Sequence, residues 1–391
     1  MRRELMIDHL KEIFGDTGEK IRVFFAPGRV NFFGGHDDSN GMPALGCALP
    51  LGTMAAARLR SDRMIRVCRL NNKEGIREFS LDDDLENGKQ DNWFDFFKSI
   101  FWIFLQRGCE LPCGLDVVME GDIPPRAGLA LSGSLEILTA WILNEMYELD
   151  GINARQLAVL AHRAETEYVG MSCSIIDQFV PAMSKAGNAM FLSTTRLSAE
   201  HIPMHLQDLE LIVTDSRIRH RRDEAENFVR RKECEKALNK LKVVANIHRI
   251  CDLDTDRFES MKDVIMNDTY TRRAYFLVYE KARTIRAVSA LRVNNMKRFG
   301  ELMSISHASL RDDYEISCHE IDYLVDQAQN MEGVLGSRMT GGGFGGSTIS
   351  LVRKDAAEAF RETISRNYRE RFGLEAEFYT VTPDDGAREL L

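Results

Sequence analysis

The sequence contains no long run of apolar residues. Nowhere in its 391 residues is there a stretch near the roughly 18 apolar positions that a membrane-spanning helix needs. The first 16 residues lack the apolar core of a signal peptide and alternate charged and apolar side chains, as an amphipathic helix does. These absences exclude a membrane-spanning protein and predict a cytoplasmic location.

Excess positive charge and paired cysteines are also missing. Lysine and arginine number 51 against 60 acidic residues, and the net charge of −9 argues against binding to nucleic acid or anionic membranes. The eight cysteines are scattered, without the Cys-x-x-Cys or Cys/His spacing of a zinc site. We therefore expect free thiols, a small-molecule partner only, and a monomer.

What remains is the composition of an ordinary globular protein, with 28% charged and 44% hydrophobic residues. At roughly 100–200 residues per domain, the length predicts two domains, which we place at residues 1–195 and 196–391. Short apolar runs predict strands between residues 21 and 70 and over 114–124, 209–220, 347–352 and 375–381. Apolar spacing of three and four predicts helices from residue 132, over 154–170, through most of 225–330, and over 354–372. Strands and helices mix without a strict βαβ rhythm, which favours an α+β fold.

Three glycine-rich segments stand out. Residues 26–41, "APGRVNFFGGHDDSNG", hold more charge and backbone freedom than a linker needs. Residues 121–136, "GDIPPRAGLALSGSLE", place glycines and serines just before a helix, where N–H groups and the helix dipole favour a phosphate, although a simple helix-capping turn has the same composition. Residues 337–352 hold five glycines between 341 and 346. This density indicates a backbone that passes close to another group or adopts positive φ repeatedly, although a flexible hinge would have the same composition.

A fourth segment, residues 164–183, carries three carboxylates, of which two stand out. Glu165 falls within a helical pattern, and Asp177 stands among apolar neighbours. A buried aspartate needs a partner, which would be a cation, a substrate hydroxyl or a structural salt bridge.

Together and in this order, the segments resemble the galactokinase branch of the GHMP small-molecule kinases. The resemblance rests on "PGRVNFFGGHDDSNG", "PPRAGLALSGSLE", "AETEYVGMSCSIIDQF" and "MTGGGFGGS". It implies a GHMP kinase fold, with an N-terminal domain like ribosomal protein S5 and a ferredoxin-like C-terminal domain. It also implies ATP, Mg²⁺ and phosphorylation of a sugar hydroxyl at C1.

The resemblance also assigns roles to individual positions. Asp177 matches the catalytic aspartate and Arg29 its partner arginine, while Ser132 and Glu165 match the magnesium ligands. The ATP-binding phosphate loop corresponds to Gly128, Leu129, Ala130, Leu131, Ser132, Gly133 and Ser134.

Departures from the family pattern gather at the sugar-binding positions. Gly35 replaces a glutamate, Ser174 replaces a glycine, and Asn227 aligns with a sugar-contacting tyrosine, whereas His36 and Asp38 keep their places. In the phosphate loop, alanine and leucine replace two serines and glycine replaces alanine at position 133, with the length unchanged.

Three functions are therefore open. The first is an ATP-dependent sugar 1-kinase that acts on galactose or a galactose-like sugar. The second is a kinase for an acidic sugar such as galacturonate, favoured by the missing carboxylate at Gly35. The basic residues Arg217, Arg219, Arg221 and Arg222 either favour the same sugar or form a solvated surface. The third is a non-catalytic sugar sensor, against which the presence of both Arg29 and Asp177 counts.

Overall fold

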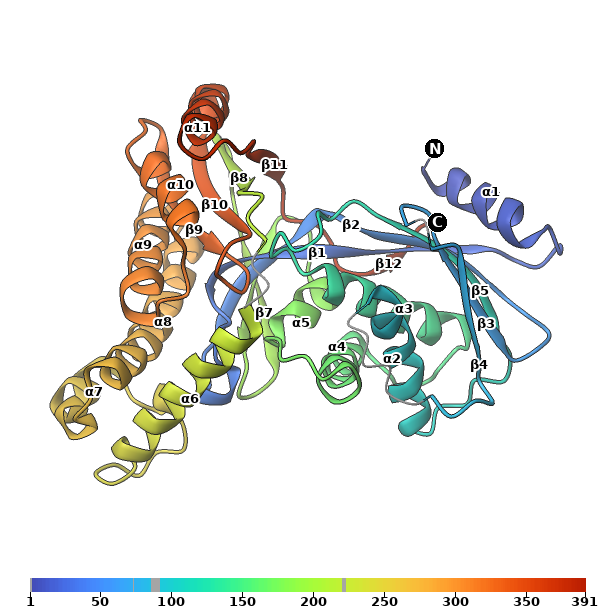
Figure 1. Ribbon diagram of the computed structural model, residues 1–391, viewed down its shortest axis with the longest axis horizontal. Helices are drawn as coiled ribbons and strands as arrows, with labels where there is room; N and C mark the ends of the chain where they lie inside the picture. The colour runs from blue at the N-terminus through green and yellow to red at the C-terminus, as the bar shows by residue number, and fades with distance from the viewer. Residues whose placement is uncertain (1, 73, 86–91, 220–222) are drawn as a thin grey trace.

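The computed structural model describes residues 2–72, 74–85, 92–219 and 223–391. Two largely antiparallel sheets are covered by helices, which confirms the expected α+β class (Figure 1). In these residues, no helix is both long enough and apolar enough to cross a bilayer.

The helices and strands have the following bounds. The helices are α1 Arg2–Phe14, α2 Trp93–Gln106, α3 Leu131–Met146, α4 Ala154–Arg163, α5 Ile176–Met183, α6 Asp223–Leu241, α7 Thr255–Met261, α8 Asp268–Arg292, α9 Met296–Ser309, α10 His319–Gln329 and α11 Ala357–Phe372. The strands are β1 Arg22–Gly34, β2 Ala44–Leu59, β3 Met64–Arg69, β4 Ile76–Ser80, β5 Leu115–Gly121, β6 Asn188–Ser193, β7 Ser198–Pro203, β8 Leu209–Asp215, β9 Val334–Thr340, β10 Ser347–Arg353, β11 Glu377–Val381 and β12 Arg388–Glu389. Short 3₁₀ turns cover Asp38–Asn40, Ile250–Asp252, Lys262–Ile265 and Lys354–Ala356, and π-helical turns cover Ala164–Val169 and Leu310–Tyr314.

The larger sheet has the strand order β12-β1-β2-β5-β3-β4, with the β6–β7 hairpin joined to β2. Its two faces follow from the period of two along each strand. On β1, Phe24 and Ala26 face the core formed with helices α2 to α5, while Val23 faces Met6 and Leu10 of α1. Helices thus cover both faces of this part of the sheet, and α2, α3, α4 and α5 lie beneath it in Figure 1.

The smaller sheet has the order β11-β8-β10-β9 and is antiparallel throughout. On β8, Ile212 packs toward α10 and α11, whereas Leu211 and Val213 share a core with Val30 and Phe32 from the second half of β1. Strand β1 therefore pairs with β2 in the larger sheet along its whole length, and side chains of its second half also pack against the smaller sheet.

The boundary predicted near residue 195 falls between β6 and β7, which pair with each other in the larger sheet. Strand β12 also returns to pair with β1, through Phe24 with Glu389 and Phe25 with Arg388. The larger sheet therefore includes strands from both sides of residue 195.

Candidate active site

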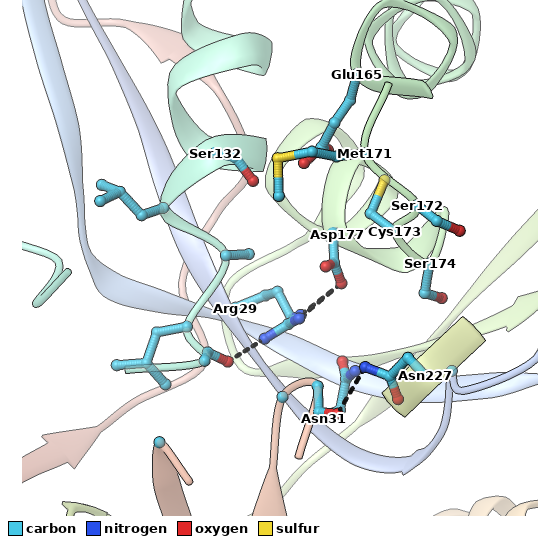
Figure 2. A pocket seen from close by; sticks show the side chains of 18 of the residues that line it. Arg29, Asn31, Ser132, Glu165, Met171, Ser172, Cys173, Ser174, Asp177 and Asn227 are labelled. Carbon is cyan, nitrogen blue, oxygen red and sulfur yellow. Dashed lines mark hydrogen bonds and ion pairs between the residues drawn. The ribbon is translucent and has the colours of Figure 1, made fainter. Parts of the chain in front are cut away.

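A cavity of about 1100 Å³ opens between the end of β1, the start of α3, the segment before α5 and the glycine-rich turn between β9 and β10 (Figure 2). It gathers most of the residues predicted from the sequence. Those that line it are Arg29, Gly35, His36, Asp38, Gly128, Leu129, Ala130, Leu131, Ser132, Glu165, Ser174, Asp177 and Asn227.

Arg29 and Asp177 form an ion pair in this cavity. The Nε and Nη2 atoms of Arg29 donate to Oδ1 of Asp177 over 2.9 and 2.7 Å. The register of β1 against β2 shifts between Pro27 and Arg29, and such a bulge changes the direction in which a side chain points. Asp177 lies in the first turn of α5. Two residues that are 148 positions apart are thus brought together, as the resemblance implied.

The predicted phosphate loop is attached to the same arginine. The Arg29 N–H donates to the carbonyl of Leu129 over 3.0 Å, and Nη1 donates to the carbonyl of Gly128. Helix α3 begins directly after Ala130, which has φ of 58° and provides no side-chain cap. The first N–H groups of the helix therefore lack both intrahelical and capping partners, which makes this end suited to an anion.

Gly133 and Ser134 do not line the cavity, although both fall within the predicted loop. The Ser134 hydroxyl is fully buried, donates to the Ala26 carbonyl over 2.8 Å and lies 3.0 Å from Oγ1 of Thr53. A Cβ atom on Gly133 would lie 2.1 Å from the Asp177 carbonyl oxygen. Ser134 thus fastens α3 to the sheet, and Gly133 allows α3 to touch the backbone of α5.

Ser132 and Glu165 point toward the same part of the cavity from facing elements (Figure 2). Glu165 lies in the π-helical turn Ala164–Val169, a rare geometry that is frequent at functional sites. Burial raises the pKa of Glu165 and the charge of Asp177 adds to this effect, while hydrogen bonds from Cys173 and Ser132 oppose it. A hydroxyl and a carboxylate beside a phosphate loop fit Mg²⁺, which takes few protein oxygens and keeps phosphate ligands.

Two buried residues behind Glu165 escaped the sequence analysis. The amide Nε2 of Gln178 donates to Oε2 of Glu136 over 3.0 Å and to Oε2 of Glu165 over 2.5 Å. Burial and the charge of Glu165 raise the pKa of Glu136 well above its usual range. The available signal was spacing, because Glu136 lies four residues after Ser132 on one helix face and Gln178 adjoins Asp177.

The residues at the sugar-binding positions form the other end of the cavity. Asp38 is held by two donors, the Ser174 hydroxyl at 3.0 Å from Oδ1 and the Ile175 N–H at 2.7 Å from Oδ2. Gly35 has φ of 78°, and a Cβ there would lie 3.2 Å from Nδ2 of Asn31 and 3.6 Å from the Ser174 hydroxyl. Two of the departures seen in the sequence, at positions 35 and 174, therefore lie side by side.

His36 and Asn227 complete this end. Burial, together with the positive charges of Arg338 and Arg29, lowers the pKa of His36 to about 3, so its ring stays neutral at physiological pH. Asn227 on α6 donates to the Gly342 carbonyl over 3.3 Å. Within that glycine-rich turn, glycines 341, 343, 345 and 346 have positive φ, and a Cβ on Gly341 would lie 2.6 Å from the Gly128 carbonyl oxygen, which confirms that its backbone passes close to another segment.

The basic segment after β8 is engaged elsewhere as far as the structure describes it. Arg217 pairs with Glu377, and Arg219 pairs with the buried carboxylate of Asp215. Arg221 and Arg222 lie outside the described residues.

Comparison with known proteins identifies the relatives of this chain. Three family models match the chain. The galactokinase galactose-binding signature matches residues 9–59, the GHMP kinases N terminal domain matches residues 95–185, and the GHMP kinases C terminal model matches residues 287–370. Galactokinase of Bacillus subtilis is 40% identical over 98% of this chain and 99% of its own length, and galactokinase of Clostridium acetobutylicum is 39% identical over 99% and 98%.

A solved structure agrees in fold. Lactococcus lactis galactokinase, crystallised with galactose, superimposes with a TM-score of 0.95 at 33% identity and full coverage of both chains. The GHMP kinase fold expected from the resemblance is thereby confirmed. With relatives of this identity along nearly its whole length, the chain belongs to the galactokinase family of the GHMP kinases.

Proposed function

We propose that the chain transfers the γ-phosphate of ATP to the C1 hydroxyl of galactose. The observation that carries the proposal is the ion pair of Arg29 and Asp177, placed between an uncapped helix N-terminus and a cavity end lined by His36 and Asp38. The galactose-binding signature over residues 9–59 and the galactokinase relatives support galactose as the sugar.

The residues around the ion pair can supply the positioning and the charge stabilisation that phosphoryl transfer needs. Such reactions pass through a loose transition state that is accelerated mainly by positioning and charge stabilisation. Asp177 orients the sugar hydroxyl and accepts its proton, while Arg29 positions the Asp177 side chain and neutralises charge on the moving group. The first N–H groups of α3 bind the phosphates that remain.

We further propose that Ser132 and Glu165 hold Mg²⁺. When bound, the ion would neutralise phosphate charge and orient the nucleotide. Gln178 donates to the Oε2 atom of Glu165 and so fixes the orientation of that carboxylate.

An assay of ADP release over galactose, galacturonate, fucose, arabinose, glucose and N-acetylgalactosamine tests the proposal. We expect galactose to be phosphorylated at C1, and replacement of Asp177 by alanine to abolish turnover while ATP still binds. Normal turnover by that variant would sink the assignment of Asp177. Absence of activity with every sugar would favour a sensor.

The same panel tests the acidic-sugar alternative. Arg217 and Arg219 are paired with carboxylates outside the cavity, and the sugar end of the cavity already holds Asp37, Asp38 and Asp177. A sugar carboxylate would be repelled there. We therefore expect galactose to be preferred over galacturonate.

We propose that the enzyme works as a cytoplasmic monomer. All eight cysteines are free, which suits a reducing compartment. Size-exclusion chromatography with light scattering tests the monomer, for which the expected mass is 44.5 kDa.

A further inference from the structure

Asp38 is the carboxylate through which the sugar end of the cavity can recognise a hydroxyl. It lines the cavity, and the two residues before α5 already bind it, with one donor on each oxygen. The Ile175 donor is a main-chain N–H that any residue at that position would supply. The Ser174 donor is a side-chain hydroxyl, and the resemblance gives glycine at this position. The contact at Oδ1 is therefore a feature of this chain's own sequence.

Gly35 and Ser174 are parts of one local arrangement. The Cβ direction of Gly35 points toward the Ser174 hydroxyl, the Asn31 amide and the Ile176 side chain, at 3.6, 3.2 and 3.4 Å. A long side chain at position 35 would need the space that the Ser174 hydroxyl occupies. The glycine at 35 and the serine at 174 are therefore compatible with each other, and a carboxylate at 35 would compete with the hydroxyl for that space.

The bonds from Ser174 and Ile175 matter most when a sugar lacks the hydroxyl that faces Asp38. A site that depends on a substrate hydroxyl rejects an analogue without it, because the buried acceptor is left unpaired. Here Oδ1 keeps the Ser174 hydroxyl and Oδ2 keeps the Ile175 N–H, whichever sugar is bound. The missing carboxylate at Gly35 removes a second acceptor that would otherwise need a partner.

We propose that Ser174 is a specificity-determining residue that, together with Gly35, relaxes recognition of one sugar hydroxyl. The substrate class then includes galactose-like aldoses that are deoxygenated or epimeric at the carbon facing Asp38. This inference rests on the proposed function, since it concerns the sugar site of the same reaction.

The experiment measures kcat/KM for galactose and for its 2-, 3-, 4- and 6-deoxy analogues. For the wild-type chain, we expect the analogue that lacks the hydroxyl facing Asp38 to lose less than about 10-fold in kcat/KM. In Ser174→Ala, loss of the donor leaves Oδ1 unpaired when the hydroxyl is absent, and one analogue should lose a further 10- to 100-fold or so relative to galactose. Ser174→Thr keeps the hydroxyl and should retain the wild-type ratios.

Ser172→Ala is the matched control. Ser172 is an exposed serine of the same segment, whereas the two oxygens of Asp38 are bound by Ser174 and Ile175, so removal of the Ser172 hydroxyl should leave the ratios unchanged. Equal analogue ratios in the wild type and Ser174→Ala, with galactose phosphorylated by both, would overturn this inference alone. Failure of the wild-type chain to phosphorylate any sugar would overturn the proposed function and the inference with it. If Ser174→Ala does not fold, the wild-type chain alone tests the inference. A loss of kcat/KM above about 100-fold for the analogue that lacks the hydroxyl facing Asp38 would then overturn it.

Discussion

At the scale of single residues, the sequence predicted the pairing of Arg29 with Asp177 better than the contacts around it. Arg29 and Asp177 were assigned from short motifs, and their ion pair is present. The bond from Ser174 to Asp38 could not be predicted, because it joins residues 136 positions apart and depends on the rotamer of a small side chain. For Ser134 the motif predicted a role in ATP binding, but its hydroxyl donates to the Ala26 carbonyl of the larger sheet instead.

Replacing Arg29 with lysine tests the role of guanidinium geometry. The side chain makes two contacts with Asp177 and one with the Gly128 carbonyl, and a lysine ammonium cannot reproduce that fork. We expect kcat to fall by about 10²- to 10³-fold with little change in the unfolding temperature. Arg163→Lys, in an exposed pair with Glu167, should leave kcat unchanged, and equal kcat values for both variants would contradict the assignment.

Asp38 should make sugar binding depend on pH. Burial, reinforced by the charges of Asp177 and Asp37, raises the pKa of Asp38 to about 7, although the Ile175 and Ser174 bonds oppose the shift. The carboxylate ionises as pH rises from 6 to 8, and an ionised acceptor binds a sugar hydroxyl more strongly, so the KM for galactose should fall over that range.

The effect of Asp38 on stability has the opposite sign. The folded chain holds the proton more tightly than the unfolded chain between the ordinary value of 3.8 and about 7, so the contribution of Asp38 to the unfolding free energy declines over that interval. Asp38→Asn should remove both dependences. A KM profile that is identical in the wild type and this variant would show that another group is responsible.

At the scale of elements, the sequence predicted the periodic helices and the apolar strands. Helices α3, α4 and α11 and strands β1, β5, β8 and β10 appear where their patterns placed them. Strands β4 and β7 were missed because they are short and mostly exposed or half-buried, so their residues show no apolar face. The contact between α3 and α5 was also beyond prediction, because it depends on the absence of a side chain at Gly133.

Gly133→Ala tests that contact between elements. An added Cβ would lie 2.1 Å from the Asp177 carbonyl oxygen, so α3 and α5 must separate. A displacement near 1 Å at a reacting group can cost about 100-fold, and we expect kcat to fall by about 10- to 100-fold. Gly133→Ser should lose more than Gly133→Ala. Wild-type kcat in both variants would show that the helices can separate without moving Asp177.

At the scale of the whole molecule, a buried carboxylate on α8 joins the end of β1 to α9. Glu280 on α8 accepts from the Gly34 N–H at the end of β1 over 3.1 Å and from Ser306 on α9 over 2.7 Å. It also pairs with the buried guanidinium groups of Arg283 and Arg338. This network could not be predicted from the sequence, because its members lie on four separate elements, β1, α8, α9 and β9.

Glu280→Gln should destabilise the entire fold. The change leaves Arg283 and Arg338 buried without a counter-charge, at a cost of about 3–5 kcal/mol. Glu301→Gln, in an exposed pair with Arg298, is the control and should cost less than about 1 kcal/mol. Urea unfolding at pH 7 measures both, and equal midpoints for the two variants would contradict the prediction.

Acid unfolding provides a second measurement of Glu280. Burial alone would raise the pKa of this carboxyl, but the charges of Arg283 and Arg338 lower it to about 2. Its stabilising contribution is therefore complete above the ordinary value of 4.5 and is lost as pH falls toward 2. The urea midpoint of Glu280→Gln should change less over that range than the wild-type midpoint.

One guanidinium group contacts both halves of the reaction site. Arg29 binds the carbonyls of the loop that would hold the nucleotide and also the carboxylate that would meet the sugar. A nucleotide that moves the loop therefore shifts the energy of the sugar site, and by thermodynamic reciprocity the sugar shifts nucleotide affinity by the same factor. Titration of galactose with and without a non-hydrolysable ATP analogue, and the reverse titration, should give one common cooperativity factor, which Arg29→Lys brings toward unity.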